Sequence, residues 1–269
     1  MSDPIASPSA EVTPPLTSAR SNLATATIIA LLLLIYPVAR WLPPGVNFLG
    51  VMLLMGAMLL VLGKAIAAQW LGVLVNERNL MSLSRFQLAG WTVAVLAAYF
   101  TYALTRMRNG SVAEALNVGV DPHLWALLGI STTSLVGSAL ILGTKKDKRP
   151  EPTVAAKTQS LTGDRAGEVE KNKQGTLYAN ADGKDAQFTD LFQGDELGNT
   201  TRVDVAKVQM FFFSVITMLA FVLMVVRSLR APSPDLGALP VVSEGMVALL
   251  GISHAGYLTN KSVDHTPLQ

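Results

Sequence analysis

Long apolar runs separated by short polar stretches dominate the hydropathy pattern of the chain. A helix needs about 20 mainly apolar residues to cross the hydrocarbon core of a bilayer. The first two runs lie within residues 23–75, and Pro43, Pro44 and Gly45 separate them. Pro-Pro-Gly favours a sharp turn. The pattern therefore predicts an N-terminal transmembrane hairpin.

Four further runs are expected to form helices, at about 86–104, 122–142, 208–226 and 240–258. Asp121 followed by Pro122 is a typical helix start, because the carboxylate caps free amides and proline fits the first helical position. The last run is the weakest, since it contains Glu244 and His254. It is expected either to span the membrane or to lie partly buried against the other helices.

The polar segment, defined here as residues 144–204, divides the apolar runs into two groups. It is rich in Gly, Asp, Lys and Gln and has few apolar residues, so most of it is expected to be a disordered loop. One short amphipathic element of one or two helical turns is expected near its end. That element contains Phe188, Leu191, Phe192, Asp195 and Glu196.

The two ends of the chain are predicted to be tails, over residues 1–22 and 261–269. The first is rich in Pro, Ser, Thr and Ala, which predicts disorder. It lacks the basic start of a cleavable signal peptide, so the first apolar run is interpreted as a signal anchor.

An internal repeat becomes visible when the sequence is shifted by 122 residues. Residues 126–131 and 248–253 both read ALLGIS, and the same register places Gln87 on Gln209, each two residues after a basic residue. Two matching blocks in one register indicate a duplicated two-helix unit, over residues 80–143 and 205–260. Because each unit has an even number of spans, the two copies would insert the same way round, as a parallel repeat.

The repeated motif contains small residues of the kind that let membrane helices approach closely. Gly129 and Gly251 are equivalent, as are Ser131 and Ser253. With Gln87 and Gln209 these residues are predicted to form either a helix-packing face or the lining of a polar path, and the sequence leaves both interpretations open.

Basic residues flanking the apolar runs predict the orientation in the membrane. If six helices span and the N-terminus is cytoplasmic, eleven flanking Lys and Arg residues lie on the cytoplasmic side and five on the other. The positive-inside rule then favours cytoplasmic N- and C-termini and a cytoplasmic polar segment.

Composition excludes several kinds of chemistry. The chain is 50% hydrophobic, only 15% charged and has no cysteine, so disulfides, thiolate metal sites and a cysteine nucleophile are excluded. A net charge of +2 gives no case for nucleic-acid binding. No phosphate-binding loop or hydrolase motif is present. We therefore expect no enzyme activity, cofactor or metal site, and Glu244 and His254 remain as intramembrane ionisable candidates.

Two stretches carry a family resemblance. Residues 188–213 read FTDLFQGDELGNTTRVDVAKVQMFFF, and residues 249–258 read LLGISHAGYL. Together they resemble bacterial multi-pass membrane proteins of no assigned activity. The resemblance covers roughly the C-terminal third and implies the bacterial cytoplasmic (inner) membrane.

The sequence supports two functional hypotheses. In the first, an all-α membrane protein of about six transmembrane helices is an anchor or scaffold that docks a cytoplasmic protein through Phe188, Leu191, Phe192, Asp195 and Glu196. In the second, the two pseudo-symmetric hairpins, in a homo-oligomer or alone, form a channel or transporter for ions or small solutes. The lipid bilayer is the partner that both hypotheses require.

Overall fold

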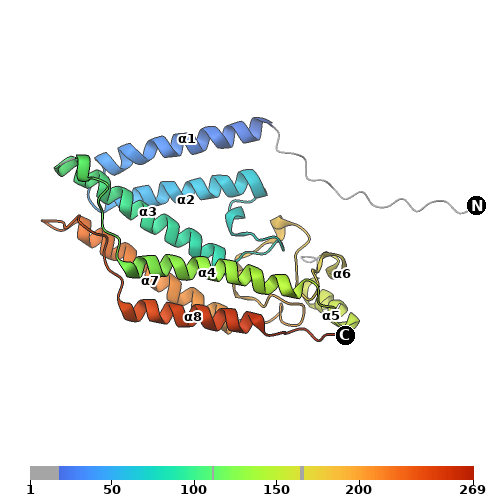
Figure 1. The fold of residues 1–269 in the computed structure, drawn as a ribbon. Helices are drawn as coiled ribbons and strands as arrows, with labels where there is room; N and C mark the ends of the chain where they lie inside the picture. Colours follow the sequence, from blue (N-terminus) through green and yellow to red (C-terminus); the bar gives the residue numbers. More distant parts are fainter. Residues whose placement is uncertain (1–17, 111, 164–166) are drawn as a thin grey trace, which may run out of the picture.

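The computed structural model describes residues 18–110, 112–163 and 167–269, and within them it is all-helical with isolated bridges in place of strands (Figure 1). Six long helices form the body: α1 (Ser18–Trp41), α2 (Val46–Ala67), α3 (Leu83–Asn109), α4 (Pro122–Lys145), α7 (Val205–Leu229) and α8 (Glu244–Ser262). Two short helices, α5 (Pro152–Thr162) and α6 (Val169–Asn172), lie within the polar segment.

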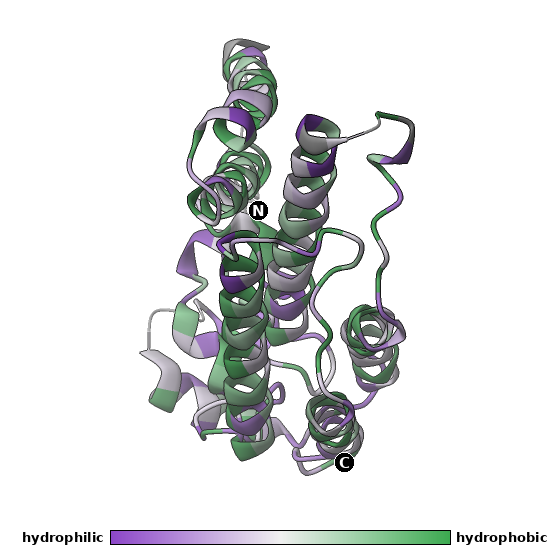
Figure 2. Cartoon of the chain, turned by 90° about the vertical axis from the view of Figure 1, so that its left-hand side faces the viewer, coloured by the Kyte–Doolittle hydropathy of each residue, from purple (hydrophilic) through white to green (hydrophobic). Residues whose placement is uncertain are grey.

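Five of the long helices, α1, α2, α3, α4 and α7, are long and apolar enough to cross a membrane. Hydrophobic residues dominate the helices, whereas hydrophilic residues are concentrated in connections and near helix ends (Figure 2). Together these helices identify the chain as a multi-pass membrane protein. The N-terminal hairpin is α1 and α2, which pack on each other across the Pro43-Pro44-Gly45 turn.

Helix α8 does not reach the hydropathy of these five, yet it packs along α4 and α7 within the same bundle (Figure 1). Its buried face carries both apolar and polar side chains: Leu250, Ser253, His254, Tyr257 and Lys261. The sequence left open whether this segment spans or lies buried against its neighbours. The structure buries one face of it against two helices.

The helices alternate in direction, so the start of α3, the end of α4, the start of α7 and the end of α8 meet at one end of the bundle (Figure 1). The polar segment also lies there, and we call this the polar-segment end. Between the helices, Trp91, Tyr102 and Phe221 are at most 1% exposed and pack with smaller apolar residues in one hydrophobic core.

The predicted disorder of the polar segment is wrong for its described residues. Besides α5 and α6 it contains 3-10 turns at Gly183–Asp185 (η4) and Phe188–Phe192 (η5). Residues Leu177, Tyr178, Leu191 and Leu197 are at most 3% exposed. Its apolar residues are few but are gathered into two small clusters, one of which includes side chains from the start of α3 and from α7. The short helical element expected here is confirmed over Phe188–Phe192 as η5, whereas Asp195 and Glu196 lie beyond its end.

The polar segment is joined to the bundle by close backbone contacts. Gly175 has a φ of +62°, and a Cβ there would overlap the carbonyl oxygens of Lys145 and Lys146. Glycine is therefore required by both conformation and space. The C-terminal residues, predicted to be a tail, also pair with this region, because Pro150 and Leu268 form an antiparallel bridge.

Helix starts follow the 122-residue register found in the sequence. Helices α3 and α7 begin at residues 83 and 205, and α4 and α8 begin at residues 122 and 244. Both pairs differ by 122. The predicted tail over residues 1–22 lies mainly outside the described residues, and α1 already begins at Ser18.

Candidate functional site

A buried ionic cluster, centred on Asp195, joins the polar segment to the helix ends. The Asp195 carboxylate lies 2.5 Å from Nη2 of Arg78, 3.1 Å from Nζ of Lys207 and 3.0 Å from Nζ of Lys261. The three cationic side chains are only 3–6% exposed. We call these four residues the Asp195 cluster.

Neutral acceptors complete the coordination of the three cations. Arg78 also donates to the carbonyl oxygens of Tyr178 and Asp195, at 3.1 and 2.8 Å. Lys207 donates to the carbonyl of Gln193 at 2.6 Å. Lys261 donates to the hydroxyl of Ser138 at 2.8 Å. A buried charge is tolerated only when it is paired and hydrogen-bonded, and this cluster meets that condition with one carboxylate and several backbone groups.

Burial alone would raise the pKa of Asp195, but the positive charges of Lys207, Lys261 and Arg78, with the Arg78 hydrogen bond, hold that pKa well below 3.8. The unfolded chain therefore takes up a proton at a higher pH than the folded chain does. The stability contributed by Asp195 is present above pH 3.8 and is lost as the pH falls below it.

This linkage gives a testable pH dependence. The difference in unfolding free energy between the wild type and Asp195→Asn should be constant at neutral pH and should shrink as the pH falls from about 4. Denaturant unfolding of both proteins in one detergent, measured from pH 7 down to pH 3, checks this. A difference independent of pH would mean that the carboxylate charge is not what stabilises the fold.

A second buried ion pair lies beside this cluster. Nζ of Lys145, at the end of α4, is 2.5 Å from Oε1 of Glu196, and both side chains are 2% exposed. The Glu196 carboxylate also accepts from the backbone N–H of His265, at 3.1–3.2 Å. Lys145 additionally donates to the carbonyl of Val263 at 2.6 Å. One pair thus joins α4, the polar segment and the C-terminal residues.

A line of polar side chains continues from Lys261 into the bundle between α4 and α8. The Ser138 hydroxyl is 3.3 Å from the Tyr257 hydroxyl, and the Ser134 hydroxyl is 2.6 Å from Nδ1 of His254. Ser134 and Ser138 are one helical turn apart, so they lie on the same face of α4. We call these contacts, with Lys261, the α4–α8 polar line.

The structure places the two predicted glutamines in different environments. Gln87 is fully buried and donates across to Ser214 of α7, at 2.5 Å. Gln209 is exposed. Gln87 therefore packs α3 against α7, while its sequence equivalent faces away from the bundle.

The equivalent small residues of the repeat also differ in their surroundings. A Cβ on Gly129 would meet nothing within 4 Å, whereas one on Gly251 would lie 3.8 Å from Ile130 of α4. Ser131 and Ser253 are both buried, and the Ser253 hydroxyl has no hydrogen-bond partner among the described residues. Gly251 therefore lies at ordinary contact distance from α4, while Gly129 lies on an open face.

Only one of the five predicted docking residues presents a large exposed side chain. Phe188 is 48% exposed, whereas Leu191 is fully buried and Phe192 is partly buried against neighbouring apolar residues. Asp195 and Glu196 bind cations of the bundle. The two ionisable candidates also differ, because Glu244 is exposed at the start of α8 and His254 is buried against Ser134.

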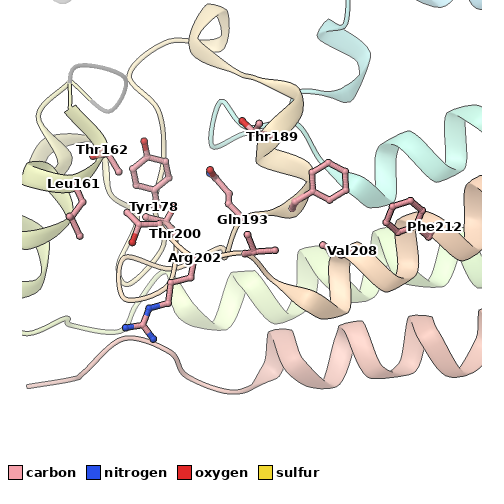
Figure 3. Close-up of a pocket in the computed structure, with 12 residues that line it drawn as sticks. Leu161, Thr162, Tyr178, Thr189, Gln193, Thr200, Arg202, Val208 and Phe212 are labelled. Carbon is pink, nitrogen blue, oxygen red and sulfur yellow. The ribbon is translucent and has the colours of Figure 1, made fainter.

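A groove of about 660 Å³ lies where the polar segment meets the start of α7 (Figure 3). Thr162, Gln193 and Arg202 line it from the polar segment, and Val208 and Phe212 line it from α7. We call it the α7 groove. Sequence reasoning missed it, because its walls come from stretches that are far apart along the chain.

The cations of the two ionic groups were also missed as a site. The Lys207 ammonium, at the start of α7, points inward to Asp195. The available signal was the number of basic residues at helix ends, which the structure pairs with two adjacent acids of the polar segment.

Comparison with family models, with curated proteins and with solved structures gives no match.

Proposed function

We propose that the chain is a membrane scaffold, in which the helical bundle fixes the polar segment in one orientation at one face of the bilayer for binding to a protein partner. The observation that supports this most directly is the pair of buried ionic groups. Asp195 and Glu196 attach one loop to the ends of α4, α7 and α8. Attachment of this kind reduces the ordering entropy that a flexible loop would lose on binding.

The partner surface in this proposal is the aromatic corner around Phe188. Its ring contacts Phe192 and Phe211 edge-to-face, with centroids 5.8 and 6.0 Å apart. Aromatic side chains that are held rigidly and are partly exposed are frequent binding hot spots. Of the docking residues predicted from sequence, Phe188 is the one we retain as a direct contact, and the other four support it.

The finer topology belongs to the same proposal. The excess of basic residues at the polar-segment end favours cytoplasmic N- and C-termini and a cytoplasmic polar segment. The bacterial inner membrane is proposed from the sequence resemblance alone. Helices α3 and α7 start 122 residues apart, as do α4 and α8, and this supports a parallel duplication of the α3–α4 unit as α7–α8.

A photo-crosslinking side chain at position 188 tests the scaffold proposal in native membranes. We expect one reproducible crosslinked protein, and we expect Phe188→Asp to reduce its co-purification by roughly tenfold or more, as loss of a hot spot does. Val112→Asp is the matched control, because Val112 is equally apolar, 70% exposed and at the opposite end of the bundle. Unchanged co-purification with Phe188→Asp would contradict the proposal.

A channel or transporter is the second candidate, and the α4–α8 polar line is the observation that favours it. It brings Lys261, Tyr257, Ser138, His254 and Ser134 into one file within a bundle that is otherwise mainly apolar. Polar and ionisable groups inside a membrane bundle often mark ion or proton paths. Reconstituted protein that passes protons or small ions, and stops when His254 is replaced by Leu, would favour this function over the scaffold.

A further inference from the structure

The α7 groove has a polar end whose hydrogen-bonding groups lack partners. Nε2 of Gln193 and Oγ1 of Thr200 are both buried, line the groove and have no hydrogen-bond partner among the described residues. Thr200 is only 4% exposed. A buried polar group without a partner costs about 1–3 kcal/mol, so two of them in one groove point to a ligand that supplies acceptors.

The charge of the groove has one sign. Arg202 is the one charged residue among those that line it, and no carboxylate lines it. Arg202 is exposed at the polar segment and has no ion pair within the described part of the chain. Figure 3 shows the Arg202 side chain extending away from Gln193, so its guanidinium lies at the rim of the groove. A guanidinium, an amide N–H and a hydroxyl form a donor set suited to phosphate oxygens.

Buried ion pairs hold the Gln193 and Thr200 backbones in place. The Gln193 carbonyl accepts from Lys207 of the Asp195 cluster, at 2.6 Å. The Thr200 backbone N–H donates to the carbonyl of Glu196, at 2.8 Å, and the Glu196 side chain binds Lys145. Both backbones are therefore fixed while their side-chain groups remain free for a ligand, and such preorganisation favours binding.

The other end of the groove is apolar and opens onto a lipid-facing stripe. Val208 and Phe212 line it, and Phe212 is 56% exposed. The same face of α7 continues through Ile216, Leu219 and Leu223, which are 54–67% exposed. The spacing of four, three and four residues keeps them on one side of a helix over about 16 Å. An acyl chain along this stripe would contact apolar side chains throughout.

We propose that the α7 groove is a binding site for one phospholipid with an anionic headgroup. The phosphate would accept hydrogen bonds from Arg202, Gln193 and Thr200. An acyl chain would lie over Val208, Phe212 and the exposed stripe that continues along α7 to Leu223. The groove volume of about 660 Å³ falls in the usual range for small-ligand sites. The site does not depend on whether the polar segment binds a protein.

The test uses the full-length protein in bilayer nanodiscs of phosphatidylcholine containing a minority of phosphatidylglycerol. Native mass spectrometry after release counts the phosphatidylglycerol molecules retained per chain. We expect one strongly retained molecule, and roughly tenfold weaker retention for Arg202→Gln and for Thr200→Val, since each removes a hydrogen bond to a charged group. Lys184→Gln is the matched control, because Lys184 lies on the same segment, is 65% exposed and does not line the groove.

Thr200→Val also separates binding from folding. In the absence of lipid it removes a buried hydroxyl without a partner, so the thermal stability of the protein should be unchanged or higher. Val208→Trp, which fills the apolar end without altering charge, should weaken retention as well. Retention that is equal in wild type, Arg202→Gln and Val208→Trp would overturn the proposal. Equal losses with Arg202→Gln and Lys184→Gln, and none with Val208→Trp, would show general surface attraction and would also overturn it.

Discussion

Asp195→Asn should destabilise the protein by about 3–5 kcal/mol, because it leaves three buried cations without their shared counter-charge. Arg78, Lys207 and Lys261 all lie within 3.1 Å of this one carboxylate. Asparagine has nearly the same size and keeps one acceptor oxygen, so the loss is one of charge and not of packing. The polar segment should detach first, since it supplies the carboxylate.

Limited proteolysis measures this detachment directly. The polar segment has exposed lysines, among them Lys171 and Lys184, that trypsin can cut once the segment opens. The cleavage rate should rise on the order of 10²- to 10³-fold in Asp195→Asn if opening is fast relative to cleavage.

Glu168→Gln is the control for Asp195→Asn. Glu168 lies on the same segment and pairs with Lys171, but its side chain is 69% exposed, so little change is expected. If Asp195→Asn were cleaved at the rate of the wild type, the ionic cluster would not be what holds the polar segment on the bundle.

The long helices were predictable from sequence because the bilayer sets a length and a polarity that short apolar runs cannot imitate. The turn after α1 was predictable from Pro43, Pro44 and Gly45, and the start of α4 from Asp121 before Pro122. The structure confirms the latter, because the Asp121 carboxylate accepts from the backbone N–H of His123 at 2.8 Å.

The fold of the polar segment was not predictable, because its composition resembles that of disordered chains. Composition counts apolar residues but does not count ion pairs with distant positions. Arg78 and Asp195 are 117 residues apart, and Lys145 and Glu196 are 51 apart. The stability of this region therefore depends on partners that a local window does not contain.

The candidate site shows the same limit at the level of single residues. Gln87 and Gln209 are equivalent in the repeat, yet one is buried against Ser214 and the other is exposed. A duplicated sequence gives equal residues, but the flanking helices differ: α3 is covered by α2, α4 and α7. Equal positions in a repeat therefore do not have equal burial when the copies have different neighbours.

The pair formed by Lys145 and Glu196 should show strong coupling in a double-mutant cycle. Glu196→Gln alone leaves the ammonium of Lys145 buried, and Lys145→Met alone leaves the carboxylate buried. Each single change should cost about 3–5 kcal/mol. In the double variant both charges are gone and glutamine still offers an oxygen to the His265 N–H, so its loss of stability should be smaller than that of either single variant.

Lys171 and Glu168 provide the matched control cycle. They form an ion pair in the same segment at 2.8 Å, but their side chains are 68% and 69% exposed. Their coupling should stay below about 1 kcal/mol, because solvent screens the charges and two long side chains must be ordered. Unfolding of all variants in one detergent gives both cycles. Additive effects of Lys145→Met and Glu196→Gln would mean that the two groups stabilise the fold independently, through the backbone carbonyl of Val263 and the N–H of His265 and not through their mutual attraction.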